Sequence, residues 1–373
     1  MNLAEQVRQE IFTKKKNLFN SFLNQSTYNF KKFKRFKKFK TVVLIGMGGS
    51  ILGAKAIYYF LKHKINKKFI FIDNLDESNL RKIKSENKLR NALFMIVSKS
   101  GNTSETILNA GYFKSFFSKS NVIVMSENKN NVLREFAKHN NYCFVDHNPY
   151  IGGRYSVFSE VGMLPAYLMG LNPKSFKKDI PKIIKSKKNL NKIIKDIKKI
   201  NLTNTKILIL FNYVPELNDF LFWCQQLMAE SLGKKKKGFL PVVSHSPKDH
   251  HSLLQLYLGG PNNKVFYIFH STKDNNLKIN LKSFGLNINY LSQKSYQKIK
   301  NAQKNAFVKI LGNKKIRYKE INIKNFNEKV LGRLFFIFIF KTIALGKLMK
   351  VNPFDQPAVE SVKVLTKKFL KLK

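Results

Sequence analysis

The chain has 373 residues, 43% of them hydrophobic, so it is long enough for two domains with separate cores and too apolar to be disordered. No apolar run reaches the ~18 residues that a membrane helix needs, and the N-terminus lacks an apolar signal core, so we expect a cytoplasmic protein with Cys143 and Cys224 reduced. The net charge is +47, from 69 basic and 22 acidic residues, which makes a nucleic-acid partner the first interpretation to examine.

The positive charge comes almost entirely from lysine. Only eight of the basic residues are arginines, the side chains best suited to reading bases and phosphates, so we favour compositional drift toward AT-rich codons over specific nucleic-acid binding. Residues 1–40 are expected to be helical at first and then basic, with phenylalanine at every third position in 31–40. That spacing predicts an apolar stripe on a surface helix, and stacking against a nucleic acid is the alternative.

A first series of strands begins at residue 41. Strands are predicted at 41–45, 69–74, 93–97 and 121–126, alternating with helices, as in a parallel doubly wound sheet. The glycine-rich turn 46–50 leads from the first strand into a helix near Ile51. A strand, a glycine turn and a helix N-terminus together form a cradle for a phosphate.

The third predicted strand runs into the hydroxyl-rich loop 98–106, directly ahead of a helix. Hydroxyls and backbone amides can bind a phosphate there, although a serine-rich helix cap explains the same residues equally well. Further on, paired glycines precede Arg154 in 152–156, where they let the backbone approach a ligand closely. The chain uses lysine at nearly all of its basic positions, so an arginine at 154 indicates that the geometry of its guanidinium group is needed there, or that it forms a structural ion pair.

A single lysine-rich amphipathic helix is predicted at 174–200, at the boundary with a second series of strands at 206–211, 239–243 and 264–269. Between the first two lies an amphipathic helix that carries Glu230 and ends at Gly233, which we expect in the left-handed conformation. A glutamate at a helix end is ordinarily solvated or capping.

The segment 248–256 contains His250 and His251 beside an aspartate, but adjacent residues do not easily face one metal ion, so no metal site is predicted. Residues 271–326 are expected to alternate short strands and polar turns. A long apolar core helix is predicted at 328–350 and a closing helix with Lys363 at 359–370.

Five of these stretches, in this order, resemble the glucose-6-phosphate isomerase family, which is built from two sugar-isomerase domains. They are 46–50, 98–103, 152–156, 226–234 and 352–357, and His251 accompanies them. The resemblance implies an α/β fold with two doubly wound, mainly parallel sheets and the active site between them. It divides the chain into an N-terminal helical segment (1–40), two sugar-isomerase domains (41–185 and 186–345) and a C-terminal helical segment (346–373) that completes the active site.

The resemblance also implies roles for individual residues in the interconversion of glucose 6-phosphate and fructose 6-phosphate. Glu230 would carry a proton between C2 and C1, Arg154 would stabilise the enediolate, and His251, aided by Lys363, would open the sugar ring. The residues implied to hold the phosphate are Ser50, Ser98, Lys99, Ser100, Thr103, Thr106 and Gln356, and those that line the substrate loops are Gly48, Gly49 and Gly153. His250 and Val362 depart from the family pattern, which has glutamine and glycine there.

No metal, nucleotide or redox cofactor is implied, because the carbonyl beside the transferred proton supplies the acidity. The family forms homodimers in which the histidine enters the partner's site. Two alternatives remain open: an isomerase that also accepts mannose 6-phosphate, and a non-catalytic sugar-phosphate or nucleic-acid binder.

Overall fold

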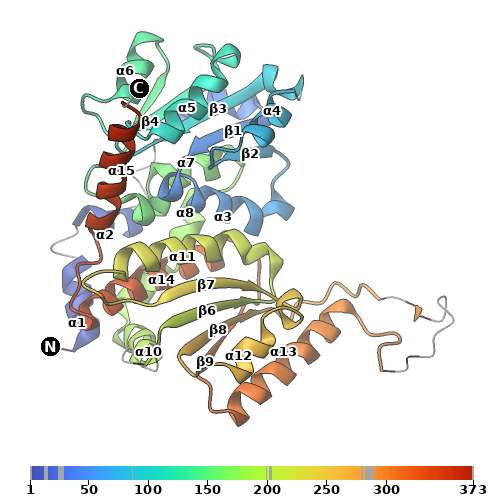
Figure 1. Ribbon diagram of the computed structural model, residues 1–373. Helices are drawn as coiled ribbons and strands as arrows, with labels where there is room; N and C mark the ends of the chain where they lie inside the picture. The colour runs from blue at the N-terminus through green and yellow to red at the C-terminus, as the bar shows by residue number, and fades with distance from the viewer. Residues whose placement is uncertain are drawn as a thin grey trace.

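Short runs of β-branched and aromatic residues form two all-parallel sheets in the computed structural model (Figure 1). The structure describes residues 2–11, 16–23, 29–85, 87–198, 200, 204–278, 280–281, 288 and 290–371. The strands are β1 (Thr41–Gly46), β2 (Lys68–Ile72), β3 (Ala92–Val97), β4 (Val122–Ser126), β5 (Cys143–Asp146), β6 (Ile207–Asn212), β7 (Leu240–His245), β8 (Lys264–His270) and β9 (Tyr318–Asn322).

Helices cover these sheets and connect their strands. The α-helices are α1 (Leu3–Gln9), α2 (Lys16–Leu23), α3 (Leu52–Phe60), α4 (Glu77–Ser85), α5 (Ser104–Tyr112), α6 (Val132–His139), α7 (Glu160–Leu168), α8 (Pro173–Lys177), α9 (Ile180–Lys185), α10 (Lys187–Lys198), α11 (Asn218–Leu232), α12 (Leu254–Gly259), α13 (Tyr296–Asn313), α14 (Glu328–Leu348) and α15 (Pro357–Phe369). The short 3₁₀ helices used below are η2 (Lys31–Lys38), η3 (Gly48–Ser50), η4 (Lys62–Lys64), η7 (Gly153–Phe158), η8 (Pro215–Leu217) and η9 (Lys248–His250).

The first sheet has the strand order β2-β1-β3-β4-β5. Alternate residues of each strand point to opposite faces, so Leu44 packs into a core shared with α3 and α7, and Ile45 into a core shared with α4, α5 and α6. Burial on both faces explains why β1 and β3 are continuous apolar runs rather than alternating ones.

The second sheet, with the order β7-β6-β8-β9, repeats the first four positions of the first sheet. Helices α11 and α14 lie between the two sheets and belong to the same hydrophobic core as α3 (Figure 1). Helices α12 and α13 cover the other face through Tyr257 and Phe307. The predicted class, an α/β protein with two doubly wound parallel sheets, is therefore confirmed.

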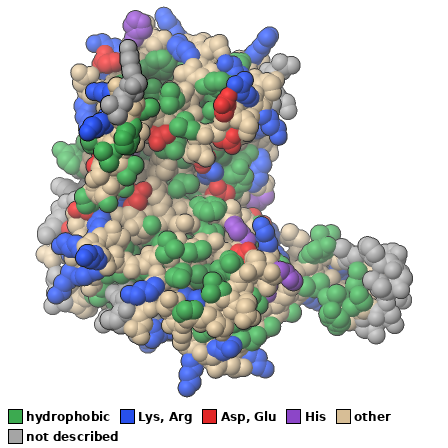
Figure 2. Space-filling model, viewed as in Figure 1, with side chains coloured by type: hydrophobic (Ala, Val, Ile, Leu, Met, Phe, Trp, Pro, Cys, Tyr) green, Lys and Arg blue, Asp and Glu red, His purple; other side chains and the backbone are tan. Residues whose placement is uncertain are grey.

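The apolar stripe predicted in 31–40 is also confirmed, although its helix is of the 3₁₀ type. A 3₁₀ helix has three residues per turn, so the phenylalanines of η2 align, and Phe33 and Phe36 are buried. Figure 2 shows lysine and arginine side chains spread over this face of the molecule rather than gathered into one patch.

Two helix predictions were wrong. The segment 174–200 forms three helices (α8, α9 and α10), because Pro181 starts a new helix and Ser186 separates α9 from α10. The segment 271–326 was expected to hold only short strands and turns, but α13 fills 296–313, with Lys304, Phe307 and Leu311 on its buried side. Within the described ranges, no helix is long and apolar enough to cross a membrane.

Candidate active site

The two loops predicted to bind phosphate meet at the point where the first sheet changes direction. From β1 the chain passes to β2 on one side, and from β3 it passes to β4 on the other. Gly46 pairs with Val97, so the loops that follow β1 and β3 leave the sheet side by side. In open α/β sheets, the crevice outside these carboxyl ends is where ligands bind.

The glycine loop approaches two other parts of the chain more closely than a side chain would allow. A Cβ on Gly49 would lie 2.2 Å from the carbonyl carbon of Gly153, at the start of η7. Gly48 has a φ of +52°, and a Cβ there would lie 2.6 Å from Nε2 of Gln226 on α11. Glycine is required at both positions, and the loop is thereby fixed against η7 and α11.

The serine loop presents hydroxyls at different depths, with Ser98 and Thr106 buried, Thr103 half-buried and Ser100 exposed. Oγ of Ser98 lies 2.8 Å from Oγ1 of Thr103. Oγ of Ser100 accepts a hydrogen bond from the amide of Asn102 at 3.2 Å. Thr106 is fully buried, and its Oγ1 has no hydrogen-bond partner among the described residues. An unpaired buried hydroxyl is unfavourable unless a ligand satisfies it.

Lys99, in the same loop, is turned toward protein groups. Its Nζ donates to the carbonyl of Pro149 at 2.7 Å and lies 3.6 Å from Oε1 of Glu127. Burial lowers the pKa of Lys99, and the Glu127 carboxylate acts against this effect.

Arg154 uses all five of its N–H donors. The side chain is 3% exposed. Nε donates to Oγ of Ser231 at 2.8 Å. Nη1 donates to Glu230 Oε2 at 3.3 Å and to Gln356 Oε1 at 2.7 Å. Nη2 donates to the carbonyls of Pro353 and Asp355 at 2.8 and 2.9 Å. The guanidinium thus joins η7, the end of α11 and the segment before α15.

Two linked hydroxyl groups support the Arg154 side chain. Ser231 accepts from Arg154, and its Oγ lies 2.9 Å from the hydroxyl of Tyr155. The Tyr155 hydroxyl donates to the carbonyl of Pro353 at 2.9 Å. Because that bond uses the tyrosine's proton, Ser231 must donate to Tyr155, so each hydroxyl has one defined role.

Glu230 lies in the last turn of α11, with its side chain 28% exposed. Oε1 accepts from Nε2 of Gln226 at 2.8 Å, while Oε2 faces Arg154. Both carboxylate oxygens are therefore oriented, and the group remains partly exposed. Gly233 ends the helix as predicted, but with a φ of −73°, so the expected left-handed conformation is wrong. A Cβ there would lie 3.0 Å from the Ala229 carbonyl, which still favours glycine.

His251 lies at the opposite end of the second sheet from Glu230. Helix α11 connects the end of β6 to the start of β7, so Glu230 lies near the amino end of β7. His251 follows β7, and Asp249 ties this segment to the strand's carboxyl end by accepting from Ser244 Oγ and from the His245 amide, both at 2.7 Å. The six residues of β7 separate the two by roughly 20 Å.

Lys363 is also outside the cluster around Arg154. Its Nζ bonds to Glu360 at 2.7 Å, and the side chain is 57% exposed on α15, whose residues are all exposed. The structure therefore brings together Gly48, Gly49, Gly153, Arg154, Glu230 and Gln356, and leaves His251 and Lys363 apart from them.

Three side chains of this cluster were not predicted as site residues: Tyr155, Gln226 and Ser231. Each neighbours a predicted residue, since Tyr155 follows Arg154, Ser231 follows Glu230, and Gln226 lies one helical turn before Glu230. The signal available in the sequence was that each of the three lies next to a predicted site residue, either along the chain or one helical turn away.

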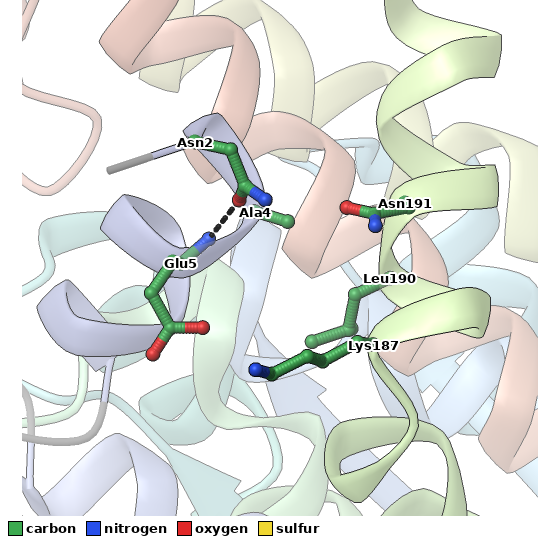
Figure 3. Close-up of a pocket in the computed structure, with 6 residues that line it drawn as sticks. All are labelled: Asn2, Ala4, Glu5, Lys187, Leu190 and Asn191. Carbon is green, nitrogen blue, oxygen red and sulfur yellow. Dashed lines mark hydrogen bonds between the residues drawn. The ribbon is translucent and has the colours of Figure 1, made fainter.

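Among the described residues, no group of three His, Cys, Asp or Glu side chains is arranged to hold a metal ion. A cavity of 190 Å³ lies between α1 and α10, away from the cluster (Figure 3). One of its polar residues, Asn2, caps α1 by accepting from the Glu5 amide at 3.0 Å.

Comparison with known proteins gives consistent results. A family model described as phosphoglucose isomerase matches residues 9–246. The glucose-6-phosphate isomerase of Methanocaldococcus jannaschii is 33% identical over 361 residues, covering 92% of this chain and 87% of that protein. The glucose-6-phosphate isomerase of Campylobacter jejuni is 29% identical, covering 88% and 85%.

Solved structures agree in fold. A hypothetical protein from Thermus thermophilus superposes with a TM-score of 0.87 at 25% identity, covering 99% of this chain and 95% of that one. A glucose-6-phosphate isomerase from Chlamydia trachomatis superposes with a TM-score of 0.73 at 20% identity, covering 99% and 75%.

Proposed function

The chain belongs to the phosphoglucose isomerase family, and on that basis we propose that it interconverts glucose 6-phosphate and fructose 6-phosphate through an enediolate intermediate. The observation that carries this proposal is the contact between Arg154 and Glu230 beside the glycine loop. This contact supports the proposal because removal of a carbon-bound proton needs a carboxylate base, and the charge that develops needs a fixed cation nearby.

The substrate phosphate binds at the carboxyl ends of β1 and β3. Its partners are the hydroxyls of Ser50, Ser98, Ser100, Thr103 and Thr106, with the unpaired Oγ1 of Thr106 as the strongest structural support. Lys99 contributes positive charge nearby, although its ammonium is shared with Pro149 and Glu127. Gln356 acts through Arg154, which it contacts directly.

Proton transfer then proceeds from an oriented base. Glu230 takes the proton from C2 of the open-chain aldose and returns it to C1, and the reverse reaction uses the same carboxylate. All five donors of Arg154 are occupied, so the enediolate oxygen must replace one acceptor. The 3.3 Å bond to Glu230 is the longest of the five and is weakened when Glu230 accepts a proton, so this is the bond that is exchanged.

Ring opening requires His251, which lies about one strand length from Glu230 in the same chain. We propose a homodimer in which His251 of one chain enters the site of the other, with Lys363 assisting when α15 packs closer to the site. Exposure of His251 and of α15 in the single chain supports this assembly. The two free cysteines, Cys143 and Cys224, support a reducing compartment, and we propose the cytoplasm.

A coupled assay tests the proposal, with fructose 6-phosphate supplied and glucose 6-phosphate detected. We expect turnover by the purified protein without added metal or nucleotide. Absence of turnover, with the protein folded and dimeric, would contradict it. The relatives from Methanocaldococcus jannaschii and Campylobacter jejuni are both named glucose-6-phosphate isomerase, so the mannose-accepting and non-catalytic alternatives are not favoured.

A further inference from the structure

A second cavity, of 470 Å³, lies at the carboxyl end of the second sheet, beneath the end of α3. Tyr213 and Val214, which follow β6, line one side, and Ser271 and Lys273, which follow β8, line the other. Its volume is in the range of sites for small molecules. Its position is at the far end of α3 from the glycine loop and Glu230.

This cavity occupies the same topological position as the phosphate loops of the first sheet. From β6 the chain passes to β7 on one side, and from β8 it passes to β9 on the other. The strand order of the first sheet diverges in the same way between β1 and β3. Open α/β sheets bind ligands in the crevice at such a point. In the second sheet, this crevice contains the 470 Å³ cavity.

The lining predicts the charge of the ligand. Lys62, Lys273 and Lys300 line the cavity from η4, the segment after β8 and α13. Nζ of Lys62 lies 4.7 Å from the centroid of the Tyr58 ring, and Nζ of Lys273 lies 5.7 Å from that of Phe326. Within the part of the chain that the structure describes, none of these three lysines forms an ion pair with a carboxylate. Lys304, one turn after Lys300 on α13, does form one, because its Nζ lies 2.7 Å from Oε2 of Glu320. Glu216 is the one acidic residue among the described lining residues. Three ammonium groups without carboxylate partners in one crevice favour a phosphate.

The lining also predicts a flat, apolar part of the ligand. Tyr59, which is 42% exposed, and the half-buried Phe326 present aromatic rings in the same cavity. Aromatic side chains stack on nucleobases in a sequence-tolerant way. We propose that this cavity binds a nucleoside monophosphate, with its phosphate near the three lysines and its base against Tyr59 and Phe326.

The proposed site adjoins the segment that carries His251. The hydroxyl of Tyr213 lies 2.7 Å from Nε2 of His250, so a ligand that contacts Tyr213 borders this segment. Binding itself does not depend on the proposed isomerase activity.

Isothermal titration calorimetry on the full-length protein at 0.15 M salt tests the site, with AMP, adenosine and inorganic phosphate as probes. We expect AMP to bind with a stoichiometry of one per chain and each of the other probes about tenfold or more weakly, because each supplies only half of the contacts. Saturating fructose 6-phosphate should leave AMP binding unchanged. Displacement of AMP by fructose 6-phosphate would overturn the proposal and assign the nucleotide to the active site.

A matched pair of variants separates this site from general charge attraction. The variant Lys62→Gln/Lys273→Gln/Lys300→Gln should bind AMP about tenfold or more weakly. The control Lys119→Gln/Lys309→Gln/Lys314→Gln removes the same charge from exposed positions outside the cavity and should bind AMP like the native chain. Equal weakening in both variants would refute a specific site.

Discussion

Oε2 of Glu230 lies 3.3 Å from Nη1 of Arg154, across the junction of the two sheets. Glu230 belongs to α11 of the second sheet, whereas Arg154 follows the strands of the first. The other carboxylate oxygen is held by Gln226, so the carboxylate is fixed before substrate arrives. Preorganisation of this kind reduces the rearrangement needed during reaction.

Replacing Glu230 by glutamine should remove the base while preserving its shape. We expect kcat to fall about 10²- to 10⁴-fold, with KM little changed because the phosphate loops lie elsewhere. In heavy water, the native enzyme should place deuterium at C2 of the glucose 6-phosphate formed, and incorporation should fall in step with turnover in Glu230→Gln. The control Glu135→Gln, at an exposed position of α6, should behave like the native enzyme. Near-native turnover of Glu230→Gln would show that another residue is the base.

Replacing Arg154 by lysine keeps the charge but reduces five donors to three. We expect kcat to fall about 10²- to 10³-fold, and the melting temperature to fall as well, because carbonyls of Pro353 and Asp355 lose a buried partner. Assays and thermal unfolding of Arg154→Lys measure both effects, with exposed Arg333→Lys as the control. An active and equally stable Arg154→Lys would mean that charge alone is sufficient.

Mixed dimers should recover activity if His251 acts in the partner's site. Co-expression of His251→Ala with Glu230→Gln places both lesions in one site of a mixed dimer and none in the other. We expect about one quarter of native activity, because half of randomly formed dimers are mixed and each holds one intact site. Each variant expressed alone is the control. A fully active monomer would rule out the shared site.

Acid should weaken the fold through His147. This side chain is 1% exposed, and burial lowers its pKa to about 4. An unfolded histidine has a pKa of ~6.5, so between pH 6.5 and about 4 the unfolded chain binds a proton that the folded one does not. The free energy of unfolding should therefore fall as pH decreases through this window.

Urea unfolding at pH 7.5 and 4.5 measures this effect. The native protein should lose about 2–3 kcal/mol more between the two values than His147→Gln does, as the pKa difference requires. Replacement of the exposed His139 by glutamine serves as the control. Identical losses in the native and His147→Gln proteins would show that His147 titrates normally.

The strands were predictable where burial on both faces makes them continuous apolar runs, as in β1, β3 and β8. The four-residue strand β5 was missed, because it is short and only partly buried. Helix α13 was missed because lysine, asparagine and glutamine occupy half of its 18 positions and only Lys304, Phe307 and Leu311 are buried. In 174–200, the helical period was recognised but the break at Pro181 was not.

The site was predictable as a set of residues but not as a set of contacts. Motifs identified Arg154, Glu230 and Gln356, which are distant in sequence, yet only the fold shows that one guanidinium joins them. The supporting bonds of Ser231 and Tyr155 depend on the packing of α11 against η7, which no local pattern encodes. The separation of His251 from Glu230 follows from the direction of α11 relative to β7.

The five bonds of Arg154 also set an order of events during synthesis. Three of its acceptors, on Pro353, Asp355 and Gln356, lie 199 to 202 residues after Arg154 in the chain and are therefore synthesised much later. The first sheet and η7 are made long before them, so Arg154 must remain incompletely paired until residues 353–356 have been synthesised. A chain that stops short of residue 353 would retain both sheets yet bury a guanidinium without these acceptors. Such a fragment would be a substrate for quality control rather than a slow enzyme.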